Sequence, residues 1–185
     1  MKVLLGLSGG VDSSVAAFLL KQEGFEVTAG FMGNWEDDDG SPYCSVKEDF
    51  MDAAQVADKL SINLVQMNFA QKYKEKVFSY FLNELNKGKT PNPDIYCNKY
   101  IKFKEFTDYA LENGYDAVAT GHYSKIQVIN KEHFLCKSYD QSKDQTYFLS
   151  QVDRDIFSKI KFPLGNLLKT DVRKIAEKEN LITFD

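Results

Sequence analysis

The feature that most constrains the fold is a turn rich in glycine and serine that follows an apolar run and precedes a helical pattern. The run at residues 3–7 has the length and composition of a buried strand, and the apolar residues after the turn recur at the spacing of an amphipathic helix. Two glycines let the backbone bend sharply and approach a ligand closely, while the first free N–H groups of the helix point into the turn. The arrangement predicts a phosphate-binding site in the segment Ser8-Gly9-Gly10-Val11-Asp12-Ser13-Ser14.

This turn differs from two better-known phosphate loops. It has neither the G-x-x-x-x-G-K-[ST] pattern of a Walker A loop nor the G-x-G-x-x-G pattern of the dinucleotide fingerprint. Its hydroxyls are further donors, and Asp12 is a candidate either to cap the helix or to help hold Mg²⁺ on the phosphates. The motif resembles the PP-loop, S-G-G-x-D-S-S, of the ATP pyrophosphatase superfamily, whose members split ATP into AMP and pyrophosphate and use AMP to activate an oxygen. The alternative reading is a serine-rich cap between an ordinary strand and helix.

Length and composition fit one domain with a substantial core. The chain has 185 residues, of which 43% are hydrophobic, and a net charge of −4 argues against a globally basic nucleic-acid binder. Its three cysteines are odd in number and form no C-x-x-C pair, so the sequence favours neither a disulfide framework nor a zinc or iron–sulfur site. No apolar run approaches the ~20 residues of a membrane span, and the N-terminus lacks a signal sequence. We therefore expect a cytoplasmic protein without membrane association.

Strand and helix patterns alternate along the chain. Strands are expected at 26–32 and 62–69, helices around 53–60 and 77–85, and a final helix around 172–176. This rhythm predicts the α/β class, with a parallel sheet covered by helices on both faces, and ligands gather at the carboxyl ends of such strands. The runs at 125–129 and 133–137 are expected to form a small hairpin appended to the sheet.

A polar loop at residues 33–44 contains three consecutive aspartates, at 37–39. It lacks the spacing of a calcium loop, so a solvated loop is favoured over a metal site. Trp35 either stacks on a base or closes the loop, and the sequence does not distinguish these two roles.

The second informative stretch runs from residue 87 to residue 104. Its prolines predict a helix that begins within 94–98 and places Cys97 in the first turn, where the helix dipole and nearby lysines favour the thiolate. Five lysines against one aspartate give a local charge of +4. Tyr96, Tyr100 and Phe103 lie among these lysines, a mixture suited to phosphates and unstacked bases. The alternative is a buried structural cysteine beside a solvated lysine face.

Three motifs together resemble the bacterial tRNA-specific 2-thiouridylase family. They are N-P-D-x-x-C-N-K at 92–99, A-T-G-H-Y at 119–123 and K-D-Q-T-Y-F-L at 143–149, and the similarity runs from residue 1 to about residue 183. Members of this family place sulfur at C2 of the wobble uridine of certain tRNAs. The resemblance implies a PP-loop fold, ATP and Mg²⁺ as cofactors, tRNA as substrate, and a sulfur-relay protein or cysteine desulfurase as sulfur donor.

The resemblance also implies roles for individual residues. Attack on the α-phosphate of ATP makes the C2 oxygen an adenylate, and a persulfide on Cys97 then delivers sulfur while AMP leaves. Asp94 is the family's candidate for handling protons. The ATP-binding residues implied are Gly6, Leu7, Ser8, Gly9, Gly10, Val11, Asp12, Ser13, Met32 and Gly121. The tRNA-binding residues implied are Asn92, Pro93, Asp94, His122, Lys143, Asp144 and Gln145.

One departure from the family concerns the end of the chain. The family carries a second cysteine, in an S-T-G-I-C segment, beyond the point where this sequence stops, and neither Cys44 nor Cys136 matches it. We expect residues 1–150 to form the PP-loop ATP-binding catalytic domain and 151–185 to begin a helical tRNA-binding region. The chain is either a fragment of a longer protein or a natural shortening, and we favour a fragment, which would bind ATP and turn over poorly. The alternatives are another amidating or thiolating PP-loop ATP pyrophosphatase, or a non-enzymatic nucleotide-binding module.

Overall fold

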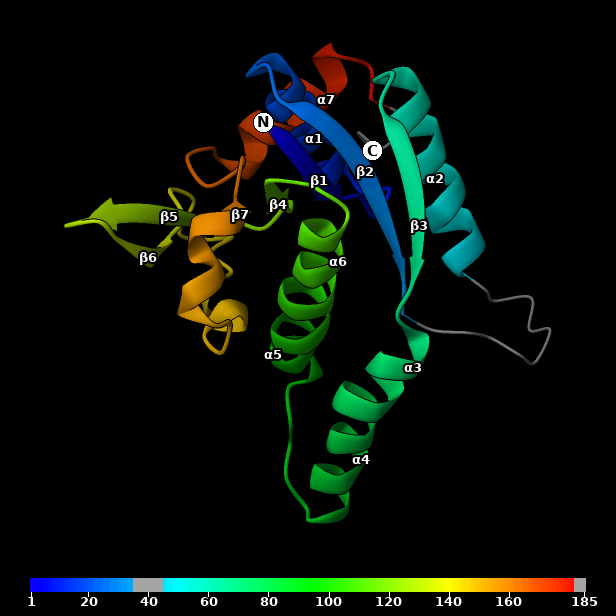
Figure 1. Ribbon diagram of the computed structural model, residues 1–185, viewed down its shortest axis with the longest axis vertical. Helices are drawn as coiled ribbons and strands as arrows, with labels where there is room; N and C mark the ends of the chain where they lie inside the picture. Colours follow the sequence, from blue (N-terminus) through cyan, green and yellow to red (C-terminus); the bar gives the residue numbers. More distant parts are fainter. Residues whose placement is uncertain (35–44, 182–185) are drawn as a thin grey trace.

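The computed structural model describes residues 1–34 and 45–181 (Figure 1). The acidic loop with Trp35, the aspartates at 37–39 and Cys44 lies outside the described residues. No helix within the described ranges is both long and apolar enough to cross a membrane.

The predicted parallel sheet is confirmed. Five strands, all parallel to their neighbours, lie in the order β3, β2, β1, β4, β7. The strand β1 is central to the site because β2 and β4 flank it and the glycine-rich turn follows it. The bounds are β1 Lys2–Gly6, β2 Glu26–Gly33, β3 Asn63–Asn68, β4 Ala117–Ala119 and β7 Ile160–Lys161.

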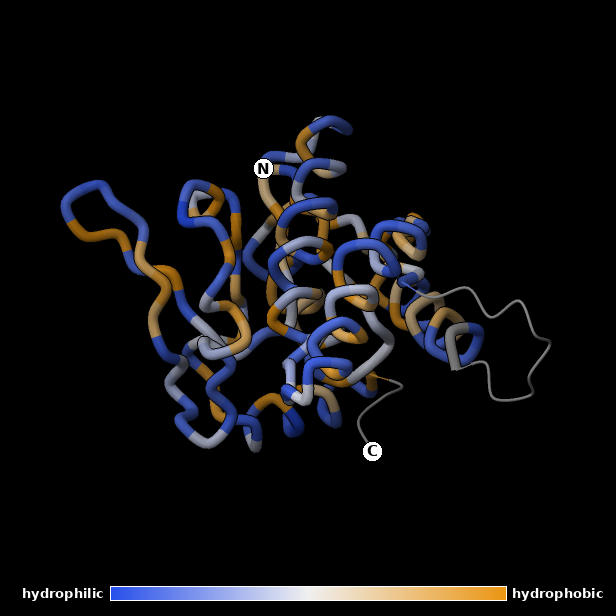
Figure 2. Tube along the Cα trace, turned by 90° about the horizontal axis from the view of Figure 1, so that it is seen from below, coloured by the Kyte–Doolittle hydropathy of each residue, from blue (hydrophilic) through white to orange (hydrophobic). Residues whose placement is uncertain are grey.

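Helices cover both faces of the sheet, as predicted. Alternate residues of β1 point to opposite faces, so that Val3 and Leu5 pack with α1, α2 and α7 while Leu4 packs under the other helices. The hydrophobic segments accordingly gather in the interior between the layers (Figure 2). The helices of the first face are α1 (Val11–Gln22), α2 (Ser45–Lys59) and α7 (Lys169–Lys178).

The second face is covered by two long helices, each containing a π-helical segment. The first consists of α3 (Ala70–Tyr73), the π segment η1 (Lys74–Phe78) and α4 (Ser79–Asn86). The second consists of α5 (Pro93–Tyr96), the π segment η2 (Cys97–Glu105) and α6 (Phe106–Glu112). The connection between α4 and α5 extends far from the sheet (Figure 1).

The helix that carries Cys97 begins slightly earlier than predicted. Asn92 caps it, because the Asn92 side chain accepts a hydrogen bond of 3.0 Å from the N–H of Asp94, and Pro93 is its first residue. Cys97 therefore follows the first turn and begins η2. The predicted place of Cys97 inside the first turn is therefore wrong by one residue, because Pro93 takes the first helical position.

The predicted hairpin is present but is not part of the main sheet. Strands β5 (Ser124–Ile129) and β6 (Glu132–Lys137) form a separate antiparallel sheet. Asn130 and Lys131 make its turn with φ values of 52° and 69°, the left-handed conformation that two-residue hairpin turns require.

The segment after the hairpin returns to the main sheet. It passes through two short 3₁₀ helices, η3 (Thr146–Leu149) and η4 (Arg154–Lys159), to β7 and α7. The strand β7 pairs with β4, and α7 packs on α1. A domain boundary near residue 150 stays a prediction, although residues on both sides of it contribute to one sheet.

Candidate functional site

The glycine-rich turn joins the carboxyl end of β1 to the amino end of α1. Gly10 is the helix N-cap and offers no side chain, and the first backbone bond of the helix runs from the N–H of Ser14 to the oxygen of Gly10 at 3.1 Å. The three preceding helix N–H groups therefore have no acceptor within the helix. Inside the turn, the Ser13 hydroxyl accepts the Ser8 N–H at 3.2 Å and donates to Gly10 at 3.0 Å. These bonds hold the turn open toward the cavity described below.

Gly9 gives the turn its shape. Its φ is +82°, and a Cβ there would lie 2.8 Å from the Cβ of Asp52 and 2.9 Å from the oxygen of Asp49. The turn thus packs against α2 so closely that only glycine fits. Gly121, after β4, makes a similar approach, since its Cβ would lie 2.9 Å from the backbone nitrogen of Ser13.

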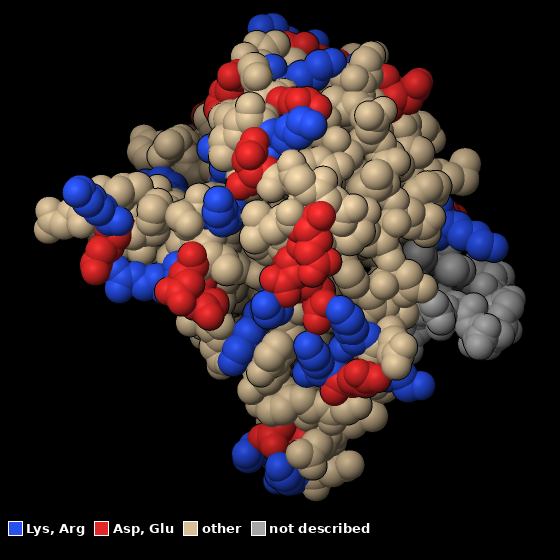
Figure 3. All heavy atoms as spheres, viewed as in Figure 1, with Lys and Arg blue, Asp and Glu red and all other residues tan. Residues whose placement is uncertain are grey.

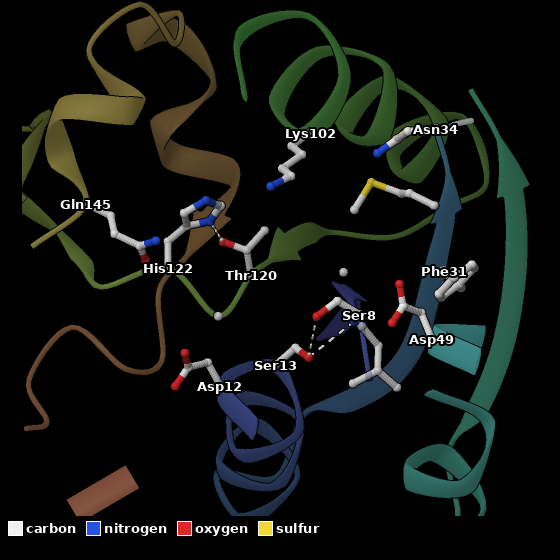
Figure 4. Close-up of a pocket in the computed structure, with 14 residues that line it drawn as sticks. Ser8, Asp12, Ser13, Phe31, Asn34, Asp49, Lys102, Thr120, His122 and Gln145 are labelled. Atoms are coloured by element: carbon white, nitrogen blue, oxygen red, sulfur yellow. Dashed lines mark hydrogen bonds between the residues drawn. The ribbon is translucent and has the colours of Figure 1, made fainter. Parts of the chain in front are cut away.

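A cavity of about 480 Å³ opens at the carboxyl ends of β1, β2 and β4, with this turn on one side (Figure 4). Sequence analysis named nine of its lining residues, which are Gly6, Leu7, Ser8, Asp12, Ser13, Met32, Gly121, His122 and Gln145. It assigned no binding role to the other five, which are Phe31, Asn34, Asp49, Lys102 and Thr120. The predicted phosphate loop and the predicted adenosine residues thus lie around one cavity.

Asp12 is not the helix cap that was one expectation for it. Its Oδ1 accepts hydrogen bonds from the Lys169 ammonium at 2.6 Å and the Tyr123 hydroxyl at 2.9 Å. Burial and the Asp12 carboxylate raise the pKa of Tyr123, so the phenol stays protonated as the donor. These contacts join the start of α1 to the start of α7.

His122 lies in the cavity wall as a neutral imidazole. Its Nδ1 is 2.8 Å from the Thr120 hydroxyl, and its ring packs against Phe103 and Phe162. Burial, with a smaller contribution from the Lys102 ammonium, lowers the pKa of His122 to about 3. At neutral pH this side chain can exchange hydrogen bonds with a ligand but adds no charge to the site.

The 143–145 segment has a structural role in the chain itself. Two hydrogen bonds of 2.9 Å join Gln145 to Tyr123. The Gln145 backbone N–H donates to the Tyr123 carbonyl oxygen, and the Tyr123 backbone N–H donates to the Gln145 side-chain oxygen. Asp144 accepts from the Ser138 N–H at 2.9 Å and the Thr146 hydroxyl at 2.6 Å, while Lys143 is exposed. The segment therefore holds the loop after β6 against the residues that follow β4.

Cys97 does not line the cavity and is only 8% exposed. Burial is the main cause of a raised pKa of the Cys97 thiol. The Lys102 ammonium lowers this pKa, and the nearby Asp94 carboxylate raises it further. The expectation of a low pKa is therefore wrong for this conformation, because the cost of desolvating a thiolate exceeds the stabilisation from the helix and the lysines.

The lysines around Cys97 are largely paired. Buried Glu84 bonds to Lys87 at 2.8 Å and Lys89 at 2.6 Å, and Lys104 pairs with Asp108 at 2.8 Å. Lys and Arg accordingly alternate with Asp and Glu over this face (Figure 3). The local charge of +4 read from the sequence is reduced by acidic residues from neighbouring turns.

Aromatic rings border the Cys97 helix. Tyr80 and Tyr96 stack with centroids 3.9 Å apart, Tyr100 lies 5.7 Å from Tyr96, and the Lys99 ammonium is 5.0 Å from the Tyr100 ring. The predicted interleaving of lysine and tyrosine is therefore present in three dimensions.

Comparison with known proteins agrees with this geometry. A family model described as the tRNA methyl transferase HUP domain matches residues 1–185. The chain is 52% identical over 182 residues to the tRNA-specific 2-thiouridylase MnmA of Chromobacterium violaceum, covering 98% of this chain and 47% of that protein. It is 49% identical over 185 residues to the protein of the same name from Pediococcus pentosaceus, covering 100% and 49%. The chain thus spans about half the length of the curated relatives it matches.

Solved structures with the same fold are more distant in sequence. A 4-thiouridine synthetase in complex with RNA and bound ATP aligns with a TM-score of 0.58 at 17% identity, over 99% of this chain and 42% of that one. NMN synthetase from Francisella tularensis aligns with a TM-score of 0.56 at 19% identity, over 99% of this chain and 64% of that one. At such identities the likeness concerns the fold alone.

Proposed function

Because the chain belongs to the tRNA methyl transferase HUP domain family, we propose that it is the catalytic part of a tRNA-specific 2-thiouridylase. In this proposal the protein adenylates the C2 oxygen of the wobble uridine with ATP. The outer sulfur of a Cys97 persulfide then attacks C2 and AMP leaves, and a second thiol breaks the remaining S–S bond by forming a disulfide with Cys97. The observation that carries the proposal is the cavity at the strand ends, whose lining unites the PP-loop with the A-T-G-H-Y motif. Relatives about 50% identical over nearly the whole chain are named 2-thiouridylases, which supports it.

The cavity residues fit ATP. The free N–H groups of the turn and the Ser8 hydroxyl are donors for phosphate oxygens. At the opposite end, Phe31 and Met32 offer apolar surface to a base, and the buried Asn34 Oδ1 has no hydrogen-bond partner among the described residues. An unpaired buried acceptor is costly unless a ligand donates to it, and the amino group of adenine is such a donor.

Asp12 is the residue that would help hold Mg²⁺ on the phosphates. Mg²⁺ in nucleotide sites takes one or two carboxylates together with phosphate oxygens. The Asp12 carboxylate lines the cavity, and the Lys169 ammonium now neutralises one of its oxygens. The Tyr123 hydroxyl bonds to the same oxygen, Oδ1, so Oδ2 is the Asp12 oxygen that Mg²⁺ would take.

Cys97 supplies the sulfur in this proposal, and Asp94 handles protons near it. Its burial in the present conformation keeps the thiol protonated and out of solvent, which protects it from oxidation before tRNA binds. Asn92, Pro93 and Asp94 form the start of its helix, where Asp94 is exposed and the other two are half-buried, so a flipped base can reach them. His122 and residues 143–145 are proposed to contact the tRNA from across the cavity. The sulfur donor is a relay protein or a cysteine desulfurase, and the site of the reaction is the cytoplasm, where tRNA and ATP meet.

The direct test is AMP release from α-labelled ATP with Mg²⁺, with and without unmodified tRNA that has a wobble uridine. We expect AMP when that tRNA is present and none with a tRNA that lacks the wobble uridine. Absence of ATP binding in calorimetry, or a bound flavin in the purified protein, would contradict the proposal and favour a nucleotide-binding module.

The sulfur step has its own test. With a sulfur donor and tRNA, Cys97→Ser should abolish 2-thiouridine formation while leaving ATP affinity within about twofold, because Cys97 does not line the cavity. Cys136→Ser is the matched control, since Cys136 lies on the hairpin strand β6. Retained 2-thiouridine in the Cys97→Ser variant would refute the role of this thiol.

A further inference from the structure

Lys102 is the one cationic side chain among the described residues that line the cavity. It extends from the helix of Cys97 toward the turn that holds Ser8 and Ser13, on the opposite side of the cavity (Figure 4). The side chain is half-buried, and no hydrogen bond or ion pair joins its ammonium to another residue within the ranges the structure describes. Most lysines around it are paired, so its isolation is a local exception.

The remaining cavity charges are negative or absent. Asp12 and Asp49 both line the cavity, and His122 is neutral because its pKa is about 3. A polyanion such as a nucleoside triphosphate therefore meets hydroxyls, backbone N–H groups and, among the described lining residues, one ammonium, because the Lys169 ammonium behind Asp12 is bound to that carboxylate. The turn itself lacks the lysine with which a Walker A loop contacts phosphates.

The π-helical segment η2 brings Lys102 to the same side of the helix as Cys97. In an α-helix, two residues five apart point ~140° away from each other around the axis. In a π-helix the N–H of residue i+5 bonds to the carbonyl of residue i, so such residues lie on nearly the same face. Cys97 and Lys102 are five apart at the start of η2, and the Lys102 charge acts on both the Cys97 thiol and His122.

We propose that Lys102 is a catalytic residue of the adenylation step, whose ammonium contacts the α-phosphate of ATP from the side opposite the PP-loop. This inference rests on the proposed function and adds to it the residue that replaces the missing lysine of the loop. In that step the uracil C2 oxygen forms a bond to the α-phosphorus, and the bond from that phosphorus to the bridging oxygen breaks. The electron pair leaves with pyrophosphate, and the proton on N3 of the base passes to solvent.

The charge of Lys102 matters most in the transition state. Negative charge builds on the non-bridging oxygens of the α-phosphate as the uracil oxygen approaches, and a preorganised cation stabilises that charge without reorganising solvent. Because the ammonium has no ion-pair partner to give up among the described residues, it is available to the phosphate at once. Removal of such a group costs about 10²–10³-fold in rate in comparable sites.

The first test is titration with MgATP and with adenosine of the wild-type chain, Lys102→Gln and Lys102→Arg. Lys102→Gln should bind MgATP about tenfold more weakly, since it loses a charge-assisted contact, and adenosine equally well. Lys102→Arg should stay close to wild type. Lys104→Gln is the matched control, because Lys104 is exposed on the same helix and paired with Asp108.

The second test observes Lys102 without changing it. Lysines labelled by reductive ¹³C-methylation give one NMR signal each, and the Lys102 signal is the one missing from Lys102→Arg. We expect saturation with MgATP to shift this signal and to leave the Lys104 signal in place. An unmoved Lys102 signal in a chain shown by calorimetry to bind MgATP would overturn the proposal.

The two proposals fail in different ways. A wild-type chain that does not bind MgATP contradicts the proposed function and, with it, the role of Lys102. A wild-type chain that binds MgATP while Lys102→Gln binds it equally well, with the same tRNA-dependent rate of AMP release, contradicts the role of Lys102 alone.

Discussion

The burial of Cys97 predicts how its reactivity changes with pH. A raised pKa means that the thiolate is scarce near pH 7 and increases as the pH rises beyond the ~8.5 of an ordinary thiol. We therefore expect iodoacetamide to alkylate Cys97 more slowly at pH 7 than it alkylates the half-buried Cys136, with the rate still rising above pH 9. Peptide mass spectrometry over a pH series measures both rates in one sample.

The same alkylation measurement would show whether substrate binding changes the accessibility and protonation of the Cys97 thiol. If tRNA and ATP bring Cys97 out of its apolar surroundings, alkylation at pH 7 should accelerate when both are added. Fast labelling of Cys97 at neutral pH in the free chain would contradict the buried, protonated thiol.

His122 predicts a specific loss of stability in acid. Its pKa of about 3 lies far below the ~6.5 of an exposed histidine, so the unfolded chain binds a proton between these values and the folded chain does not. The free energy of unfolding should therefore fall as the pH drops below ~6.5, by up to ~1.4 kcal/mol per pH unit from this residue alone. Above pH 6.5 both states leave the imidazole neutral, and the effect disappears.

The comparison of wild type with His122→Gln isolates this contribution. Denaturant unfolding at pH 7 and pH 5 should show a decline that is about 2 kcal/mol smaller in the variant. Equal declines in the two proteins would mean that His122 takes up its proton in the folded state.

At the residue scale, the sequence located lining residues of the cavity where a motif has its own local geometry, while their roles stay predictions. The PP-loop residues and Gly121 belong to short segments whose sequence alone determines the local backbone, so they can be recognised without the rest of the fold. Phe31 and Thr120 lie next to the predicted residues Met32 and Gly121. Asp49 and Lys102 reach the cavity only because helices distant in sequence meet there. In the sequence, Lys102 is only one of five lysines in a basic stretch. The side of the helix on which it lies depends on a π-helical segment, which no residue pattern predicts.

Among the elements, the turn after β1 and the helix α2 are predicted to depend on each other. Gly9→Ala introduces a side chain at φ +82° and places its Cβ 2.8 Å from Asp52, so α2 must shift. We expect a loss of about 2–4 kcal/mol, from backbone strain and displaced packing together, and weaker MgATP binding. Thermal and denaturant unfolding measure the loss, and calorimetry measures the affinity.

Gly24→Ala is the matched control. Gly24 has nearly the same φ, +81°, but a Cβ there would meet nothing within 4 Å. It should cost about 1 kcal/mol, the strain of the left-handed backbone, and leave MgATP affinity unchanged. Equal losses in the two variants would show that the contact with α2 does not constrain the turn.

Most elements were predictable because their apolar periodicity matches their structure. The strands β1, β2 and β3, the helices α1, α2 and α7 and the hairpin all follow such patterns. The strand β7 is only two residues long, Ile160–Lys161, which is too short for a period to be read. Its place beside β4 comes from tertiary packing alone, so no local signal indicated it.

At the scale of the whole molecule, residues after 150 are part of the hydrophobic core and do not form a separate extension. Leu164, Val172, Ala176 and Leu181 are fully buried in the cluster that includes α1, and Lys169 bonds to Asp12. Burial of a Val or Leu side chain contributes about 1.5–3 kcal/mol, and the net stability of a domain is only about 5–15 kcal/mol. Loss of the whole segment is therefore comparable to the total stability.

A chain cut after residue 150 tests this directly. We expect it to lose cooperative unfolding and MgATP binding together, because the sheet loses β7 and α1 loses its cover. The control shortens the hairpin instead, replacing residues 128–133 by Asn-Gly, which keeps Gln127 opposite Phe134 and removes mainly exposed residues. That variant should unfold cooperatively and bind MgATP as wild type does, because the hairpin forms a sheet of its own. A 1–150 chain that folds and binds MgATP would instead support the boundary predicted from the sequence and would make β7 and α7 the first elements of a separate region.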